Sequence, residues 1–527
     1  MDYELFETHI KTKLELLDVL YEAEAGVRIS TLAIKLGTGE KNVVKYMEDL
    51  QEDLAQFHIV EDGEAEIDFF KGKGYSFNGN ELDYKKLALF ILNQSMNFSL
   101  LRNLFLNHDV DTRNILDNYY ISESTLRRKI AAINHYVSSY GLSLKHNRGR
   151  LIMVGKEMTI RYFGYRFFWR FYTGVSWPFP AIDQRKILPL VKLALENYKL
   201  AQKNALIQEF SYFFALNVTR FHNKYPIPAE ALPDYIREIN HQLLFPRSSF
   251  YQEFQQSFHV TDDEVEFTGL LFQCRVQFYM QDNKLREALL IHQQFNTSIY
   301  ELYTLFIQLT DIMYTPVETQ LNLNFCHALI LSAHLHSMFF ESFITVASGY
   351  DLSFFYQKNY PHLFEYMRGI LQKMKQQSSS PILENEAFLL PRYCEAFSAI
   401  NIFTKFEPKI VVKIDTNLTM ALEYILAQKL EQIFKNFYNI RFISFIEIDQ
   451  SAEEHYDIIL SSVIQDVEGS QYKGIPLYTF RPQLAVSDIT KIHQILENYV
   501  TNYSNTSTRE NGWLFNTSRR GHYSPTP

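Results

Sequence analysis

The feature that most constrains this 527-residue sequence is a change of hydrophobic pattern near Pro408. From about residue 165 to 400, Leu, Ile, Phe and Tyr recur at helical spacing without clear strand alternation. We therefore expect two all-helical domains that meet between residues 285 and 295. After Pro408, short apolar strands at 410–414, 440–446, 458–461 and 477–480 alternate with helices at 418–437 and 488–500, which is typical of a parallel α/β domain.

Composition narrows the class of protein. Hydrophobic residues make up 46% of the chain, so most of it can build folded cores, and its length calls for several of them. The N-terminus lacks the pattern of a signal peptide, and no apolar run approaches the roughly 20 residues of a membrane helix. We expect a soluble, cytoplasmic protein without a membrane partner. The cysteines Cys274, Cys326 and Cys394 are too dispersed for a disulfide framework or a zinc cluster, so we expect buried thiols, no metal site and no cofactor.

The N-terminal residues carry a helix-turn-helix pattern. Apolar spacing predicts one helix from Lys11, a short second helix from Ile29 that ends at Gly37, and a third helix through Val43 and Leu54. The third helix turns three candidate DNA-binding side chains outward: Lys41, Asn42 and Lys45.

The residues after this third helix predict a wing. Strands over 57–60 and 65–70 would be joined by a turn at 61–64. Nine acidic residues and no Lys or Arg lie between Lys45 and Lys71, a distribution that repels phosphate. DNA binding and a role as a helical packing module therefore both stay open for this first unit.

A second unit shows the same pattern with favourable charge. Ile115 and Tyr119 belong to a scaffold helix, and Ser122 occupies the N-cap position of a following helix through Leu126 and Val137. Strands over 142–146 and 151–154, joined through 147–150, predict a wing. The candidate DNA-binding residues of the helix and the wing tip are Ser124, Thr125, Arg127, Arg128, Lys129, Arg148 and Arg150.

Charge is concentrated around this second unit. The chain carries a formal charge of −9, yet the segment from Arg127 to Arg161 contains eight basic residues and the single acid Glu157. An N-cap, a basic helix face and a basic wing together favour DNA binding over the alternative, a solvated face of an ordinary helical domain.

The residues of the second unit resemble a known family. The runs 120–128, 140–142, 155–157 and 160–163 look like the second helix-turn-helix of the Mga/AtxA-type virulence regulators. The resemblance implies a mainly α, multidomain fold with two N-terminal winged helix-turn-helix units, two helical phosphotransferase-regulation domains (PRDs) and a C-terminal α/β domain similar to EIIB components of sugar phosphotransferase systems. We expect these at residues 1–82, 83–163, 164–290, 291–402 and 403–501, followed by a disordered tail at 502–527.

The same resemblance directs attention to histidines in the PRD-like domains. His222, which follows Arg220 at the end of a buried helix, is the first candidate for phosphorylation, and Arg220 could stabilise the added charge. The helix around Cys326 to Phe340 offers the further candidates His327 and His334. These two lie about 10.5 Å apart along the helix, which opposes a shared metal ion. An ordinary helix histidine remains the alternative for each.

The C-terminal domain departs from the enzymes that it resembles. EIIB components that use cysteine carry it directly after the first strand, where this chain has Asp415, Thr416 and Asn417. We therefore expect interaction or dimerisation from this domain instead of phosphotransfer.

The sequence thus predicts a DNA-binding transcriptional regulator of virulence or carbohydrate-linked genes, and the resemblance favours activation. We expect a homodimer formed through the EIIB-like domain, double-stranded DNA and a phosphocarrier protein as partners, and control by histidine phosphorylation. The chain lacks the common catalytic motifs, so we do not expect an enzyme. The alternative is a signalling adaptor that binds protein partners without contacting DNA.

Overall fold

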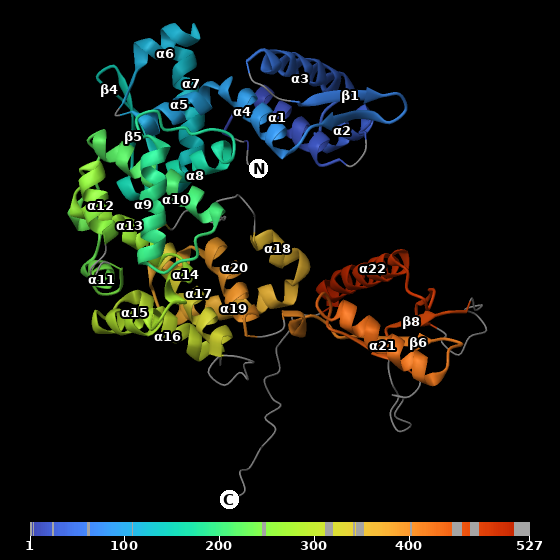
Figure 1. Cartoon of the computed structure of the whole chain (residues 1–527). Coiled ribbons are helices and arrows are strands. Elements are labelled where there is room, and N and C mark those ends of the chain that lie inside the picture. Colours follow the sequence, from blue (N-terminus) through green and yellow to red (C-terminus); the bar gives the residue numbers. More distant parts are fainter. Residues whose placement is uncertain are drawn as a thin grey trace, which may run out of the picture. The chain divides into compact units, whose positions relative to one another are not determined.

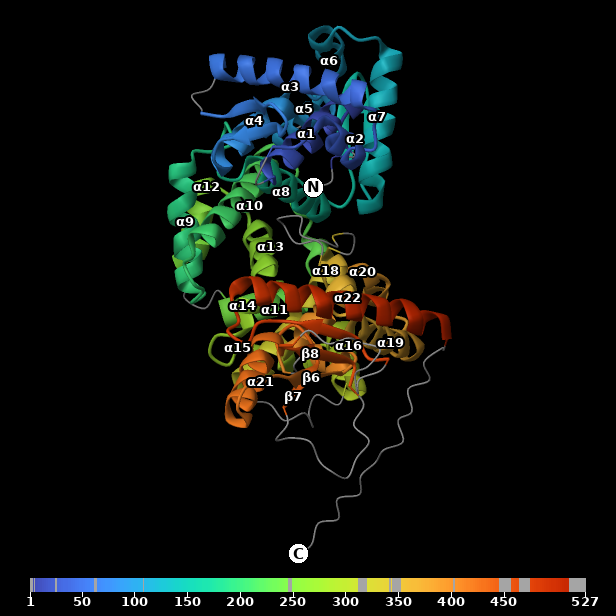
Figure 2. The same cartoon turned by 90° about the vertical axis from the view of Figure 1, so that its right-hand side faces the viewer.

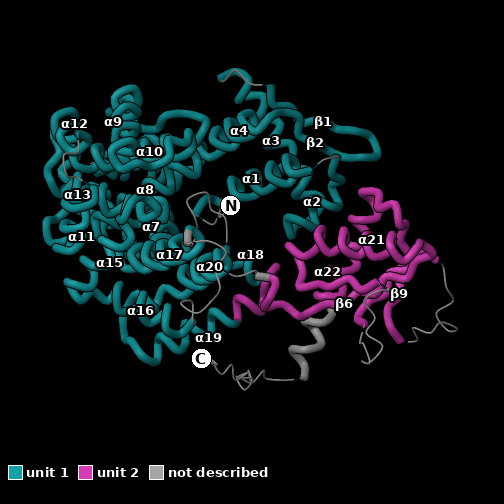
Figure 3. The backbone as a smooth tube through the Cα atoms, turned by 60° about the horizontal axis from the view of Figure 1, so that its bottom comes forward, with its two compact units in different colours: residues 1–357, 366–400 teal, residues 358–365, 401–527 magenta. Residues whose placement is uncertain are grey.

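The computed structural model describes residues 3 and 5–510, except for 24–25, 61–63, 108, 245–248, 311–319, 341–342, 344–351, 401–402, 445–455 and 464–473. The chain divides into two compact units (Figure 3). Unit 1 comprises Met1–Gln357 and Tyr366–Ile400, and unit 2 comprises Lys358–Glu365 and Asn401–Pro527. Unit 1 is helical apart from two small antiparallel sheets, whereas unit 2 holds a parallel sheet, which confirms a mainly α chain with several kinds of domain (Figures 1 and 2).

The first helix-turn-helix forms as its apolar spacing predicts. Its helices are α1 (Thr8–Tyr21), α2 (Ile29–Lys35) and α3 (Glu40–Val60). Leu14, Leu17, Val43 and Met47 fill the space between α1 and α3 and are almost fully buried. Gly37 ends the turn after α2 with a φ of +60°, a conformation that glycine adopts without steric cost.

The first wing lies later in the chain than the sequence predicts. It consists of β1 (Glu66–Phe70) and β2 (Gly74–Asn78), an antiparallel pair in which Phe70 faces Gly74. The predicted strand at 57–60 is wrong, because these residues form the last turn of α3. Phe57 continues the buried row of that helix. Residues 61–63 of the predicted turn lie outside the described residues.

Gly74 fixes how this wing meets the helices. Its φ is +98°, and a Cβ at this position would lie 2.1 Å from the carbonyl oxygen of Val27. Only glycine therefore lets Val27 and Tyr75 pair, with the Val27 amide donating to Tyr75 at 2.7 Å and the Tyr75 amide donating back at 2.9 Å. The wing is thus joined to the segment that leads into α2.

The second winged helix-turn-helix is confirmed with small shifts of its ends. Its sheet has the order β3-β5-β4, and β4 and β5 form the predicted hairpin. The elements are α4 (Glu81–Asn93), α5 (Met96–Leu106), β3 (Val110–Asp111), α6 (Thr112–Tyr119), α7 (Glu123–Val137), β4 (Ser143–Asn147) and β5 (Arg150–Val154).

The helix α8 (Glu157–Tyr172) follows this wing and is buried on several sides. A Cβ on Gly164 would lie 2.8 Å from the Phe105 ring and 2.9 Å from Leu216, so this glycine lets α8 pack closely on α5 and α10 (Asn204–His222). The expected boundary between residues 163 and 164 falls inside this continuous helix. The boundary at 82 lies at the start of α4, and the boundary at 290 falls inside α15 (Lys284–Gln294), between the buried Ala288 and Ile291.

The remainder of unit 1 is helical, as predicted. Phe210, Phe213 and Phe214 form a buried face of α10. The other helices of this region are α9 (Gln184–Asn197), α11 (Asp234–Ile239), α12 (Ser249–Phe258), α13 (Asp262–Gln273), α14 (Val276–Tyr279), α16 (Ser298–Thr310), α17 (Gln320–Phe339), α18 (Leu352–Asn359), α19 (Pro361–Gln377) and α20 (Glu386–Ser398).

Unit 2 contains the predicted parallel α/β domain. Four parallel strands have the order β7-β6-β8-β9, with bounds Ile440–Ile443, Ile410–Asp415, Ile458–Ser461 and Leu477–Thr479. Val412 and Phe442 of the sheet share an apolar core with Leu430 of α21 (Met420–Phe434) and Ile492 of α22 (Val486–Glu510).

Residues 502–510, the first part of the expected disordered tail, continue α22 in the structure. Their Asn, Ser and Thr content is unfavourable for a helix, but extending an existing helix is much easier than starting one. Residues 511–527 of the expected tail lie outside the described residues. Among the described residues, no helix is long and apolar enough to cross a membrane.

Candidate nucleic-acid interface

The turn between α6 and α7 presents the start of α7. Tyr120 ends α6 in the left-handed conformation, with a φ of 49°. Ser122 then caps α7, because its Oγ accepts a hydrogen bond from the Thr125 amide at 3.2 Å. The predicted N-cap therefore exists, and the first turn of α7 has its backbone amides directed toward the turn.

Two arginines dominate the exposed face of α7. The Arg127 side chain is 81% exposed, and its ion pair with Glu123 measures 3.5 Å. Such a surface pair contributes at most about 1 kcal/mol, so Arg127 can exchange Glu123 for a phosphate at little cost. Arg128 is exposed and donates to the Thr125 hydroxyl at 3.4 Å, and Ser124 is exposed beside them.

Lys129 is engaged differently from its neighbours. Its Nζ lies 2.6 Å from a carboxylate oxygen of Glu7, and its side chain is only 26% exposed. Burial opposes ionisation of Glu7, but hydrogen bonds from Lys129 and Ser95 outweigh it and lower the Glu7 pKa. Lys129 therefore ties α7 to the segment before α1, and its expected role in DNA binding stays a prediction.

The second wing ends in a tight two-residue turn. Arg148 and Gly149 have φ values of 48° and 82°, the left-handed pair that matches the twist of a β-hairpin. The Gly149 carbonyl accepts from the Thr112 amide at 2.9 Å, and Arg150 pairs with Asp109 at 2.5 Å. The wing is thus fastened to the start of α6, while Arg148 remains exposed at its tip.

The first unit also presents basic residues. Lys41, Asn42 and Lys45 are exposed near the start of α3, and Asn42 Nδ2 donates to the Thr38 hydroxyl at 3.1 Å. Of the acids that follow, Asp53 is buried and bound to Lys13 and Gln94, so it does not oppose phosphate at the surface.

The sequence interpretation missed the tip of the first wing. Lys71 and Lys73 are exposed on either side of Gly72, in the turn between β1 and β2. Arg28 donates to the Gly72 carbonyl at 3.2 Å and adds a third positive charge. The run Lys71-Gly72-Lys73-Gly74 was the available signal, because glycines beside lysines mark an exposed turn.

A comparison with protein families decides the nature of the second unit. Residues 80–168 match the model of the Mga helix-turn-helix domain, which spans α4 to most of α8. In this region the chain is similar to the Mga-type regulators. The predicted resemblance is confirmed, and the relationship is to regulatory proteins, not to enzymes.

Two regulators are similar to this chain over much longer stretches. A protein of Streptococcus pneumoniae serotype 4 named as a trans-acting regulator is 21% identical over 465 residues, which cover 86% of this chain and 91% of that protein. The capsule synthesis positive regulator AcpB of Bacillus anthracis is 20% identical over 318 residues, 57% of this chain and 61% of AcpB.

Outside the Mga helix-turn-helix domain, His222 is the most accessible of the three candidate phosphoacceptors. It is exposed at the end of α10, and its Nε2 bonds to the Phe258 carbonyl at 2.9 Å. Because a carbonyl oxygen only accepts, Nε2 carries the proton of the neutral ring and Nδ1 carries the free electron pair. Arg220 cannot assist as expected, since it is buried and bound to Glu157 through two hydrogen bonds.

The two candidates on α17 are less accessible. His334 is fully buried, with Nε2 bound to the Tyr393 hydroxyl at 2.7 Å, and burial lowers its pKa to about 3. His327 is partly buried and its Nδ1 bonds to the Tyr303 hydroxyl at 2.9 Å. No group of three or more metal-binding side chains occurs within the described part of the chain, and Cys326 and Cys394 are buried free thiols.

Proposed function

We propose that this chain is a DNA-binding transcriptional activator, acting in the cytoplasm, that reads DNA with the Mga helix-turn-helix domain. The observations that carry the proposal are the capped start of α7, where Arg127 and Arg128 stand exposed, and the exposed Arg148 at the tip of the second wing. The start of a recognition helix enters the major groove, and a basic wing tip lies along phosphate or the minor groove. Activation is supported by the name of AcpB as a positive regulator.

The first unit adds a second reading head in this proposal. Lys41 and Lys45 on α3 would approach the groove, and Lys71 and Lys73 would contact phosphates from the wing. Their exposure supports this role over a helical packing module.

Control by phosphorylation belongs to the proposal as well. The helical region of unit 1 would act as two PRD-like domains, and a phosphocarrier protein of the sugar phosphotransferase system would modify His222. The exposure of His222 and the free electron pair on its Nδ1 support this choice. Phosphorylation adds nearly two negative charges and can shift a packing equilibrium.

Unit 2 would serve as the EIIB-like dimerisation domain. Met420, Leu422 and Ile425 expose more than half of their surface on α21, although they are apolar, and such side chains often mark an interface. The loop after β6 has Asp415, Thr416 and Asn417 where cysteine-dependent EIIB components carry their nucleophile. Thr416 donates its amide and hydroxyl to the buried Glu423, which supports a structural role for this loop over phosphotransfer.

DNA affinity of the full chain tests the function. We would titrate wild type and Arg127→Ala/Arg128→Ala into a labelled promoter duplex and follow fluorescence anisotropy. The variant should bind at least about tenfold more weakly. The matched control Arg185→Ala/Lys186→Ala removes two exposed charges of α9 and should bind like wild type. Absence of wild-type binding would favour the adaptor alternative.

A further inference from the structure

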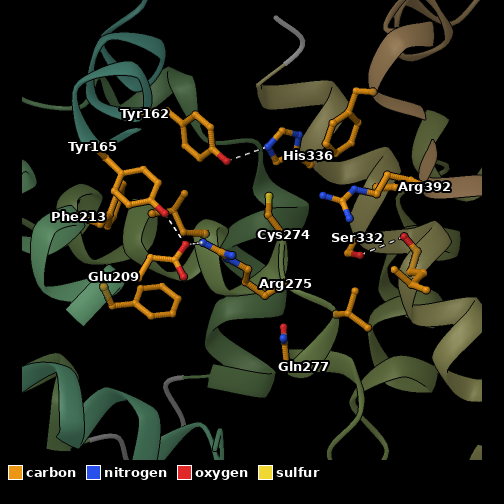
Figure 4. Close-up of a pocket in the computed structure, with 16 residues that line it drawn as sticks. Tyr162, Tyr165, Glu209, Phe213, Cys274, Arg275, Gln277, Ser332, His336 and Arg392 are labelled. Carbon is orange, nitrogen blue, oxygen red and sulfur yellow. Dashed lines mark hydrogen bonds and ion pairs between the residues drawn. The ribbon is translucent and has the colours of Figure 1, made fainter. Parts of the chain in front are cut away.

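A cavity of about 280 Å³ lies inside unit 1, where α8, α10, α17 and α20 meet the segment that joins α13 to α14 (Figure 4). Tyr162 and Tyr165 of α8 line it from one side. These residues fall within the Mga helix-turn-helix domain, whereas the other lining residues come from the helical region that follows. An occupant of the cavity would therefore contact the DNA-binding domain and the helical region together.

Two arginines give this cavity a positive character. Arg275 makes a 2.5 Å ion pair with Glu209, and its side chain is still 35% exposed. The Glu209 carboxylate also accepts from the Tyr165 hydroxyl, so its charge is already satisfied. Arg392 makes a 2.5 Å pair with Glu395. A guanidinium offers five N–H donors, so most donors of both arginines remain open for a ligand.

The aromatic side chains around these arginines hold them in place. The Arg275 guanidinium lies over the Phe210 ring at 5.6 Å, and the Arg392 guanidinium lies over the Phe388 ring at 5.4 Å. A guanidinium held against a ring loses less freedom when it binds an anion. The same rings offer apolar surface to the carbon part of a ligand.

His336 is a buried histidine in the wall of the cavity. Its ring lines the cavity, with Nε2 bonded to the Tyr162 hydroxyl at 3.0 Å, and its buried Nδ1 has no partner among the described residues. Burial, followed by the charges of Arg392, Arg166 and Arg275, holds the His336 pKa well below its usual value. The ring is thus neutral mainly because it is buried, and the three nearby arginines add to that effect.

We propose that this cavity binds a small organic anion, a phosphate ester or a carboxylate, through Arg275 and Arg392. The volume suits a metabolite of modest size and is too small for a dinucleotide. Tyr162 and Tyr165 carry the effect of binding to α8. This last step rests on the proposed function, because it requires that the Mga helix-turn-helix domain bind DNA.

Calorimetric titration of the full chain tests the site without DNA. The probes are glucose 6-phosphate, succinate, inorganic phosphate and, as the neutral control, glucose, all at constant ionic strength. We expect an anionic probe to bind with one site per chain and glucose not to bind. Glucose 6-phosphate against succinate separates phosphate esters from carboxylates. Failure of all three anions to bind, or equal binding of glucose, would overturn the proposal.

Three variants locate the binding. Arg392→Gln should weaken it by about tenfold or more, since a charge-assisted hydrogen bond is lost. Ala333→Leu keeps the charge but fills the cavity, because Ala333 is buried in its wall, and it should also abolish binding. Arg185→Gln removes an equal charge from the exposed face of α9 and should bind like wild type. Unchanged binding in both cavity variants would place the anion elsewhere and refute the site.

DNA affinity measured with and without the bound anion tests the coupling. The anion should change the affinity of wild type and leave Ala333→Leu unaffected. Anion binding without any change in DNA affinity would overturn the coupling and keep the site. Absence of DNA binding itself would refute the proposed function, and the calorimetric result would stand.

Discussion

Glu157, in the first turn of α8, forms a two-pronged ion pair with Arg220 near the end of α10, with distances of 2.9 and 2.7 Å. Arg161, also on α8, reaches both Glu157 and Glu264 of α13, so the largely covered Glu157, the buried Glu264 and two buried arginines form one network. The network joins the Mga helix-turn-helix domain to the helical region without leaving a charge unpaired. Because Arg220 is held in this network, it cannot stabilise a phosphate on His222, as the sequence had led us to expect.

Arg220→Ala should destabilise unit 1 by about 3 kcal/mol, because it leaves one acid of the buried network uncompensated. Thermal unfolding of the full chain would show a lower midpoint than in wild type. Arg185→Ala breaks an exposed pair with Asp183 and should leave the midpoint almost unchanged. Equal effects of the two substitutions would contradict the account of the network.

Stability should fall as the pH is lowered from 7 to 5. Burial lowers the pKa of His334 to about 3 and that of His292 to about 4, so both stay neutral in the folded chain. Unfolded histidines bind protons below about pH 6.5, and each such histidine then costs about 1.4 kcal/mol per pH unit. The loss begins near pH 6.5 and continues down toward the folded values.

His334→Gln tests this assignment, since it removes one of the buried rings. Its unfolding midpoint should decline less steeply between pH 7 and 5 than that of wild type. The exposed His9 has no comparable burial, so His9→Gln is the matched control and should keep the wild-type decline. A decline that is identical in all three proteins would refute the role of His334.

Lys71→Ala/Lys73→Ala should weaken DNA binding if the first wing lies on phosphate. Each lost phosphate contact lowers the slope of log affinity against log salt by about one, so the slope should fall by about two. Anisotropy titrations at several salt concentrations measure it. A slope equal to that of wild type would make the first unit a packing module.

Ile425→Asp should disrupt self-association through unit 2, because it places a charge on the exposed apolar face of α21. Sedimentation should show a dissociation constant raised by at least about tenfold. Val486→Asp changes a similarly exposed residue at the start of α22 and should leave the constant unchanged. A dimer indifferent to Ile425→Asp would move the interface away from α21.

Local signals explain what the sequence could predict. The second helix-turn-helix followed from Ser122, the apolar row through Leu126 and the turn at Arg148, all of which act within a few residues. The strand predicted at 57–60 failed because a short apolar run suits a helix end as well as a strand. The ion pair of Lys129 could not be predicted from the sequence for another reason. Its partner Glu7 is 122 residues away, and no local pattern contains that contact.

Distant packing also decided the histidines and the boundaries. The exposure of a histidine depends on residues far away in the chain. His334, for example, is covered by Tyr393, which lies 59 residues away. The boundary at residue 163 crossed α8 because the aromatic residues that bury this helix come from both sides of it in the chain. Hydrophobic periodicity predicts which face of a helix is apolar but not which residues pack on it, so it could predict neither the exposure of the histidines nor the continuity of α8.

The central claim is that α7 of the Mga helix-turn-helix domain binds DNA through Arg127 and Arg128. Its most direct test is the salt dependence of DNA affinity for wild type, Arg127→Ala/Arg128→Ala and the control Arg185→Ala/Lys186→Ala. We predict that the affinity of wild type and control falls steeply with salt, and that the α7 variant binds more weakly with a slope smaller by about two. Equal affinities and equal slopes in all three proteins would contradict the claim.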